Sequence, residues 1–199
     1  MNGRIWLIRH GQTQWSSDGR HTGRTDIPLT PAGEQAAIDV GLRLRAALAG
    51  RTPALVLSSP LQRAMRTAEL AGCMPNDATK DLLEWDYGGW EGLTTAEIRT
   101  RLGDADWTIW SNPIPKGETP GEQTSDVAAR TRRIVERCLP LTAAGADVVL
   151  VAHGHVLRIL TATWLGLDSK AGRLFALDPA RLSVLGFEHE QHVIRQWNA

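Results

Sequence analysis

The chain contains little cysteine and no excess of charge of either sign. Its 199 residues include two cysteines, Cys73 and Cys138, which stand far apart without a CxxC pair. This scarcity argues against a disulfide framework or a zinc finger and is typical of a reducing cytosol. Lys and Arg number 22, as do Asp and Glu, so no global positive field favours nucleic acid or a membrane surface. Any recognition of an anion must therefore be local.

The sequence also lacks long apolar runs and a leader segment. No apolar run approaches the roughly 18 residues of a membrane-spanning helix. The N-terminal stretch has none of the successive charged, apolar and small-residue regions of a signal peptide. We therefore expect a cytoplasmic protein without membrane contacts. No repeat or low-complexity linker interrupts the chain, so we expect one domain over residues 1–199, a length that suffices for a substantial core.

Short apolar segments alternate with segments of helical periodicity. Strands are predicted at 4–9, 54–57, 82–83 and 147–152, with a terminal hairpin over 182–188 and 192–197. Helices are predicted from Thr30-Pro31 to Gly50, from Ser58-Ser59-Pro60 to about Ala71, over 122–142, and after His155. This alternation predicts an α/β fold with a mostly parallel central sheet.

The remaining stretches have no clean period. Residues 11–29 and 85–92 are predicted to be loops. The segment around 94–122 contains Pro113, Pro115 and Pro120 and is the least regular part of the chain, so we expect a lid-like insertion there. Lys116, Arg99 and Arg101 of this segment are either substrate contacts or solvated surface charges.

Polar residues follow two of the predicted strands. Arg9-His10-Gly11 ends the first, and His153-Gly154-His155 follows the strand over 147–152. In a parallel sheet, ligands bind beyond the carboxyl ends of the strands, so two histidines meet there if these strands are neighbours. A neutral imidazole is a nucleophile, an arginine fork binds oxyanions, and glycine allows close approach of the backbone. Together they favour an anionic electrophile such as a phosphoryl group.

A third cluster supports anion binding. Arg63 falls in the first turn of the helix that opens after Ser58-Ser59-Pro60, where a cation is unfavourable unless an anion is bound. A plain surface arginine is the alternative. A zinc site is not favoured, because the His153–His155 pair lacks a third ligand. The histidines at 189 and 192 are also three residues apart instead of the four of a metalloprotease motif.

Four ordered motifs spanning residues 4–158 resemble the histidine phosphatase superfamily, also called phosphoglycerate mutase-like. They are Arg9-His10-Gly11, SSPLQRAMRTAE at 58–69, EWDYGGWEG at 84–92 and AHGH at 152–155. The resemblance implies an α/β three-layer sandwich with helices on both faces of a mostly parallel sheet. It also implies that His10 accepts the phosphoryl group, that Arg9, Arg63 and His153 surround it, and that Glu84 is the proton donor. We expect a cationic His153 to stabilise developing charge.

The resemblance implies further substrate contacts. Thr22 and Gly23 match a loop that lines the substrate pocket of the mutases, and Ser16 stands where many members have asparagine. Gln123 replaces a serine in the element that also contains Gly121, Glu122 and Arg130. The full set of expected substrate-binding residues is Gly11, Thr13, Ser16, Thr22, Gly23, Gly154 and His155.

The length of the chain favours a phosphatase over a mutase. Only 68 residues, 85–152, separate Glu84 from His153, whereas the mutases usually have a substantial insertion there. We therefore expect a metal-independent phosphomonoester hydrolase that works through phosphohistidine, resembles acid phosphatases, and acts on a small phosphorylated metabolite such as a sugar phosphate. We expect no cofactor and no nucleic-acid partner.

Several alternatives stay open at this point. One is a cofactor-dependent phosphoglycerate mutase, and another is a non-catalytic protein that binds a phospho-ligand. A third is a zinc hydrolase that uses His10, His153 and His155, which chelators would inactivate. The sequence also leaves open whether the chain is a monomer or a homodimer.

Overall fold

A six-stranded sheet forms the centre of the computed structural model, which describes residues 2–199. The strand order is β3-β2-β4-β1-β5-β6. The bounds are β1 Ile5–Arg9, β2 Leu55–Ser58, β3 Asp77–Ala78, β4 Val148–Ala152, β5 Leu182–Glu188 and β6 Gln191–Gln196. All pairs among β1 to β4 are parallel, and β5 runs antiparallel to both of its neighbours. The expected mostly parallel sheet and the C-terminal hairpin are confirmed.

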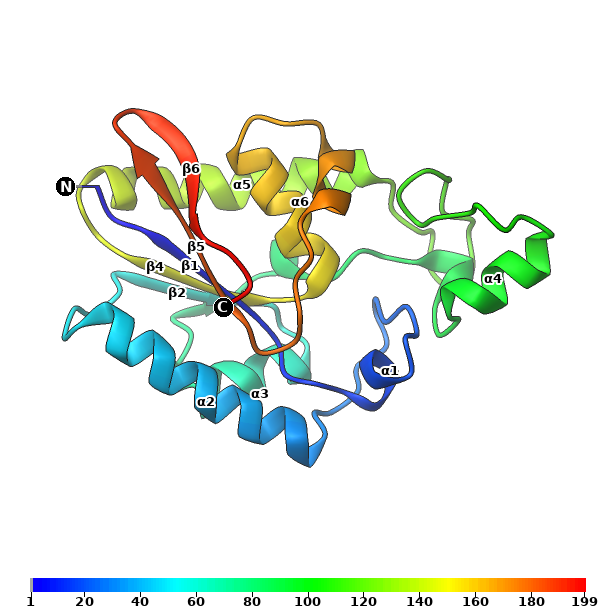
Figure 1. Cartoon of the computed structure of the whole chain (residues 1–199), viewed down its shortest axis with the longest axis horizontal. Coiled ribbons are helices and arrows are strands. Elements are labelled where there is room, and N and C mark those ends of the chain that lie inside the picture. The colour runs from blue at the N-terminus through cyan, green and yellow to red at the C-terminus, as the bar shows by residue number, and fades with distance from the viewer. Residues whose placement is uncertain (1) are drawn as a thin grey trace.

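Helices cover both faces of this sheet (Figure 1). Helices α2 (Pro31–Leu48) and α3 (Gln62–Leu70) lie on one face, and α5 (Thr124–Ala143) and α6 (Gly154–Trp164) lie on the other. The short α1 (Gln14–Ser17) and α4 (Thr95–Leu102) lie beyond the carboxyl ends of the strands. Three 3-10 turns, η1 (Lys80–Leu82), η2 (Gly88–Trp90) and η3 (Ser169–Leu174), complete the elements. Within residues 2–199, no helix is long and apolar enough to cross a membrane.

The central strands are buried on both sides, which explains their continuous apolar sequences. Successive side chains of β1 enter different cores: Ile5 and Leu7 pack with α5 and α6, whereas Trp6 and Ile8 pack with α2 and α3. The same alternation runs through β4. Because β1 and β4 are buried on both faces, the positions of their ends are well fixed.

Connections from β1 and β4 leave in opposite directions along the sheet. From β1 the chain passes through α2 to β2, on the far side of β4. From β4 it passes through α6 to β5, on the far side of β1. The crevice between two such strands is the usual ligand site of an open α/β sheet. Their adjacency also satisfies the condition for His10 and His153 to meet.

The structure corrects several local predictions. Residues 82–83 do not form a strand: η1 ends at Leu82, and the short edge strand β3 precedes it. Helix α3 is capped by Leu61 rather than by the serines before Pro60. The loop predicted over 11–29 contains α1, whose N-cap is Thr13. The segment 94–122 contains α4 and buries Trp107, Ile109, Trp110 and Ile114 in the core beside α5 and α6.

We predict that Gly41→Ala destabilises the protein although alanine favours helix. A Cβ at Gly41 of α2 would lie 2.4 Å from the Ala71 carbonyl oxygen, so α2 and α3 would have to separate. The expected loss is about 1–3 kcal/mol of unfolding free energy, measured by urea denaturation. Leu42→Ala, next in sequence and 56% exposed, is the control and should change stability little. A Gly41→Ala protein as stable as the wild type would contradict this close packing.

Candidate active site

A cavity of about 190 Å³ opens at the carboxyl ends of β1 and β4. Seven of the predicted site residues line it, and five of them come from three segments that converge here: Arg9, His10, Glu84, Gly154 and His155. They come from the end of β1, the segment before η2 and the first turn of α6. Residues that are as much as 146 positions apart in sequence (9 and 155) therefore face one small space.

His10 is oriented by its own neighbour in the chain. Its main-chain N–H donates to the Ala152 carbonyl of β4 at 2.8 Å, and its Nδ1 lies 2.7 Å from the Gly11 carbonyl oxygen. A carbonyl only accepts, so Nδ1 bears the proton and Nε2 has the lone pair. Burial, and then the nearby cations Arg63 and Arg9, lower the pKa of His10 well below 6.5. The free protein thus presents a neutral imidazole with an available Nε2.

His153 packs against His10 but is neutral, not cationic. The two rings meet edge to face with centroids 5.0 Å apart. Arg63 Nε–H donates to His153 Nδ1 at 3.1 Å, so the proton is on Nε2, which donates to Ser59 Oγ at 2.7 Å. Burial, followed by Arg63, lowers the pKa of His153 well below 6.5. The cationic His153 that we expected to stabilise developing charge is therefore wrong for the free protein.

Arg63 is fully buried and holds several separate segments. Besides its bond to His153, Nη1 donates to the Thr25 carbonyl and Nη2 to those of Thr22 and Gly23. Four of its five N–H donors are thus used, and the guanidinium connects α3 to β4 and to the 22–25 loop. Arg63 does not line the cavity, and it contacts His153, which packs against His10.

Arg9 contrasts with Arg63 because it is incompletely bonded. Its Nη1 donates to the Leu177 carbonyl at 2.5 Å, while its buried Nε has no hydrogen-bond partner within residues 2–199. Gly154 makes room for it, since a Cβ at Gly154 would lie 3.3 Å from the guanidinium carbon. An unpaired buried donor is costly. The Arg9 side chain also lines the cavity, where its cationic guanidinium is available to an oxyanion.

Glu84 lies at the N-terminus of α6. Oε1 accepts the main-chain N–H groups of Trp85 and Val156 at 2.9 Å, and Oε2 accepts that of His155 at 3.0 Å. Arg130 of α5 holds the preceding backbone through the carbonyls of Asp81, Leu83 and Glu84, and it is itself paired with Glu122 at 2.9 Å. The carboxyl group is therefore fixed against the cavity from two sides.

The predicted substrate-binding residues divide into two groups. Ser16 and Thr22 line the cavity with Gly154 and His155. The other three have structural contacts outside its lining: Gly11 donates to Thr67 Oγ1, Thr13 caps α1, and the Gly23 N–H donates to the Glu91 carboxylate. A Cβ at Gly11 would also lie 2.3 Å from the Gly33 carbonyl oxygen. Close packing of the backbone therefore accounts for a glycine at this position.

The outer wall of the cavity consists of residues that the sequence interpretation missed. They are Gly19, Arg20, His21, Tyr87, Arg158 and Leu177. Helical spacing from Gly154 and His155 would have indicated Arg158, one turn further along α6. Tyr87 is itself a residue of the EWDYG motif at 84–88. Ser59, which binds His153, could have been found from its place after β2. The wall residues outside helices and strands, Gly19, Arg20, His21 and Leu177, gave no comparable signal.

His155 is held in the wall by a phenol. Its Nδ1 lies 2.5 Å from Tyr87 Oη, and its ring contacts those of Trp85 and Trp110. Burial lowers the pKa of His155 well below 6.5 and that of His21 to about 4. The same burial raises the pKa of Tyr87 well above 10. These aromatic groups are thus neutral, and the positive charge in the cavity belongs to its arginines.

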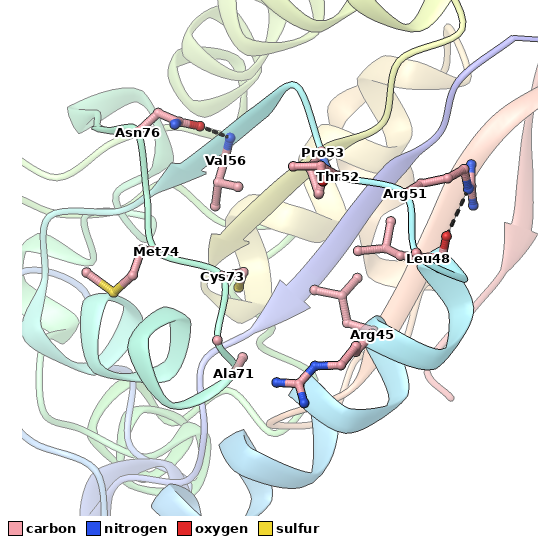
Figure 2. Close-up of a pocket in the computed structure, with 14 residues that line it drawn as sticks. Arg45, Leu48, Arg51, Thr52, Pro53, Val56, Ala71, Cys73, Met74 and Asn76 are labelled. Carbon is pink, nitrogen blue, oxygen red and sulfur yellow. Dashed lines mark hydrogen bonds between the residues drawn. The ribbon is translucent and has the colours of Figure 1, made fainter.

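A second hollow lies at the opposite end of β2 (Figure 2). It measures about 370 Å³ and is lined by the ends of α2 and α3, with Arg45, Arg51 and Cys73 among its side chains. Arg51 is paired with Asp147 at 2.7 Å, and burial raises the pKa of the Cys73 thiol to about 11. No histidine or carboxyl side chain lines it, so this larger hollow has no acid–base pair to offer.

Other groups proposed from the sequence lie outside the cavity. Arg99, Arg101 and Lys116 are exposed and do not line it. In the part of the chain that the structure describes, no three His, Cys, Asp or Glu side chains are grouped to hold a metal ion.

Comparison with known proteins agrees with this geometry. Residues 5–199 match the sequence model of the histidine phosphatase superfamily (branch 1). An acid phosphatase of Mycobacterium tuberculosis is 38% identical over 94% of this chain and 88% of its own length. A sedoheptulose 1,7-bisphosphatase of Saccharomyces cerevisiae is 34% identical over 82% of this chain and 68% of its own length.

A solved structure shows the same fold. It is that of a functionally characterised open reading frame of Mycobacterium tuberculosis, with a TM-score of 0.90 and 37% identity over 100% of this chain and 98% of that one. The phosphoglycerate mutase-like α/β architecture is therefore confirmed. The chain belongs to the histidine phosphatase superfamily, branch 1, and is a phosphatase of that family.

Proposed function

We propose that this phosphatase hydrolyses the phosphomonoester of a small metabolite, such as a sugar phosphate, through a phosphohistidine on His10 and without a metal ion. The observation that supports it most is the tautomer of His10. Its Nδ1–H is bound to the Gly11 carbonyl, which leaves the lone pair on Nε2. Both His10 and Arg9 line the same cavity.

In the first step, His10 Nε2 attacks phosphorus and the bond from phosphorus to the ester oxygen breaks. The protonated Glu84 gives its proton to the departing alkoxide, so the alcohol leaves neutral. In the second step, Glu84 takes a proton from water while the water oxygen attacks phosphorus. The N–P bond then breaks, His10 is neutral again, and inorganic phosphate leaves.

The other residues stabilise the charge and geometry of this transfer. Phosphoryl transfer depends mainly on positioning and on compensation of charge at the equatorial oxygens. Arg9 supplies a cationic guanidinium in the cavity lining. Arg63 acts indirectly, because it fixes His153 and the 22–25 loop through the bonds described above. His153 in turn packs against the ring of His10.

We predict that His10→Ala lowers kcat by about 10³-fold or more, because the nucleophile is lost. Wild-type enzyme quenched within milliseconds of mixing with ³²P-labelled substrate should contain an acid-labile, base-stable label on His10. His189→Asn, at an exposed turn position with φ of 51°, is the matched control and should retain full activity. Wild-type turnover by His10→Ala would refute the mechanism, and absence of turnover by the wild type would favour a binding protein.

The same labelled enzyme distinguishes the remaining alternatives. When water and phosphoglycerates compete for the phosphoryl group, most label should appear as inorganic phosphate. Predominant transfer to phosphoglycerate would instead identify a mutase. Full activity in EDTA is expected, whereas its loss would favour the zinc hydrolase.

We predict that Glu84→Gln slows hydrolysis of alkyl phosphates about 100-fold or more, the usual scale of general acid catalysis. p-Nitrophenyl phosphate should be much less affected, because nitrophenolate leaves without a proton. Steady-state kcat on both substrates measures this difference. Glu118→Gln, at an exposed position, is the control. Equal losses on the two substrates would contradict the assignment of Glu84 as the proton donor.

We also predict that His10 stays neutral well below pH 6.5. Long-range ¹H–¹⁵N spectra of ¹⁵N-histidine-labelled protein, assigned with His10→Ala, should show a protonated Nδ1 and a bare Nε2 at pH 6. Because the folded state has a lowered pKa at His10, His153 and His155, the unfolded state binds more protons below about pH 6.5. The unfolding free energy should therefore fall as the pH decreases through that value. A doubly protonated His10 at pH 6 would contradict the prediction.

A further inference from the structure

Arg158 lies in the cavity wall but has no part in the proposed chemistry. It projects from the second turn of α6, where its Nε donates to the Gly172 carbonyl and its Nη2 to the Arg173 carbonyl, both at 3.0 Å. Its guanidinium lies over the Trp110 ring at 4.7 Å from the centroid. Two carbonyls and an indole thus fix the plane of the group, while its Nη1 has no hydrogen-bond partner within residues 2–199.

In the described part of the chain, no carboxylate is close enough to Arg158 to form an ion pair with it, although Glu84 lies in the same cavity lining. Among residues 2–199, neither Arg158 nor Arg9 forms an ion pair. Arg158 is half-buried, and its guanidinium remains charged. Burial of a charge without an ion-pair partner is unfavourable, so an anion that binds beside Arg158 stabilises it.

The charges of the whole lining agree. Three arginines, Arg9, Arg20 and Arg158, face the cavity with one carboxyl group, Glu84. Arg20 is paired only with Glu97, at 3.9 Å between partly exposed side chains, which contributes little. The lining histidines add no charge, because burial lowers their pKa values. Glu84 is bound by three main-chain N–H groups and pairs with none of these arginines.

One phosphoryl group does not use all of these cations. In the proposed reaction it binds at His10 and Arg9. Arg158 comes from α6 and not from the end of β1, and its fixed fork suits planar or tetrahedral oxyanions. Arg9 and Arg158 line the same cavity of about 190 Å³. Because this cavity is smaller than the roughly 300 Å³ or more of drug-sized ligand sites, one small metabolite can contact Arg9 at one end and Arg158 at the other.

We propose that Arg158, assisted by Arg20, forms a second anion subsite, and that the substrate is a small metabolite with two anionic groups. One is the phosphomonoester that is hydrolysed, and the other is a second phosphate or a carboxylate. This inference rests on the proposed function of the same cavity, since it takes Arg9 and His10 as the place of the reacting phosphoryl group.

The test compares substrates that share a carbon chain. Glycerol 3-phosphate has one anionic group, 3-phosphoglycerate adds a carboxylate, and glycerol 1,3-bisphosphate adds a phosphate. Glucitol 6-phosphate and glucitol 1,6-bisphosphate repeat the comparison on a longer chain. For the wild type, kcat/KM should be at least about tenfold higher for a doubly anionic member of a pair, the scale of a charge-assisted hydrogen bond. The preferred member tells carboxylate from phosphate.

Arg158→Gln should remove this preference. Its kcat/KM should fall about tenfold or more on the doubly anionic substrate and less than about threefold on the singly anionic one, with the loss mainly in KM. Arg158→Lys should restore part of the preference. Arg173→Gln, exposed on the adjoining η3 turn, is the control and should behave as the wild type. Equal losses on both substrates would instead show that Arg158 only braces α6 against η3.

The wild-type comparison keeps the inference testable if Arg158→Gln does not fold. Equal kcat/KM values within every pair would overturn the second subsite on their own. If phosphohistidine still forms on His10 in that case, the proposed function stands and only the subsite fails. If no substrate gives phosphohistidine, the proposed function fails first.

Discussion

The buried guanidinium of Arg63 is the contact on which the rest of the site depends. It binds an imidazole that follows β4 and three carbonyls of the 22–25 loop, while its own helix packs under β2 and β4. A single side chain thus sets the tautomer of His153, the position of the loop and the closeness of the two histidines. Loss of the hydrogen-bond partners of Arg63 would leave a buried cation without partners, which is among the costliest defects in a protein interior.

The arginines of this protein have different functions that their sequence neighbourhood does not reveal. Arg63 and Arg130 are buried and nearly saturated by carbonyls or a carboxylate, so they maintain the architecture. Arg9 and Arg158 line the cavity and form no ion pair within residues 2–199, so their charges are available to a ligand. The resemblance grouped Arg9 with Arg63 as phosphate contacts, and only the hydrogen bonds separate the two roles.

Much of the fold could be predicted because local signals and burial agree. The β1 and β4 runs are apolar throughout, Thr30-Pro31 begins α2 as expected, and the strand-end rule correctly brought His10 near His153. Leu82 and Leu83 were misread because two apolar residues fit a 3-10 turn as well as a strand. The outer wall escaped prediction because Arg20, His21 and Leu177 lie on irregular segments whose positions are set by tertiary contacts alone.

The adjacency of β1 and β4 has a consequence for how the protein acquires activity. Ile5 pairs with Val148, 143 residues later, so the two histidines meet only after a contact of very high sequence separation has formed. Closing so long a loop is slow compared with forming helices. A nascent chain whose last strands are still being synthesised has His10 but no His153 beside it. A chain that ends before β4 and α6 therefore lacks His153, Gly154 and His155 of the site, so it cannot have the phosphatase activity of the folded protein.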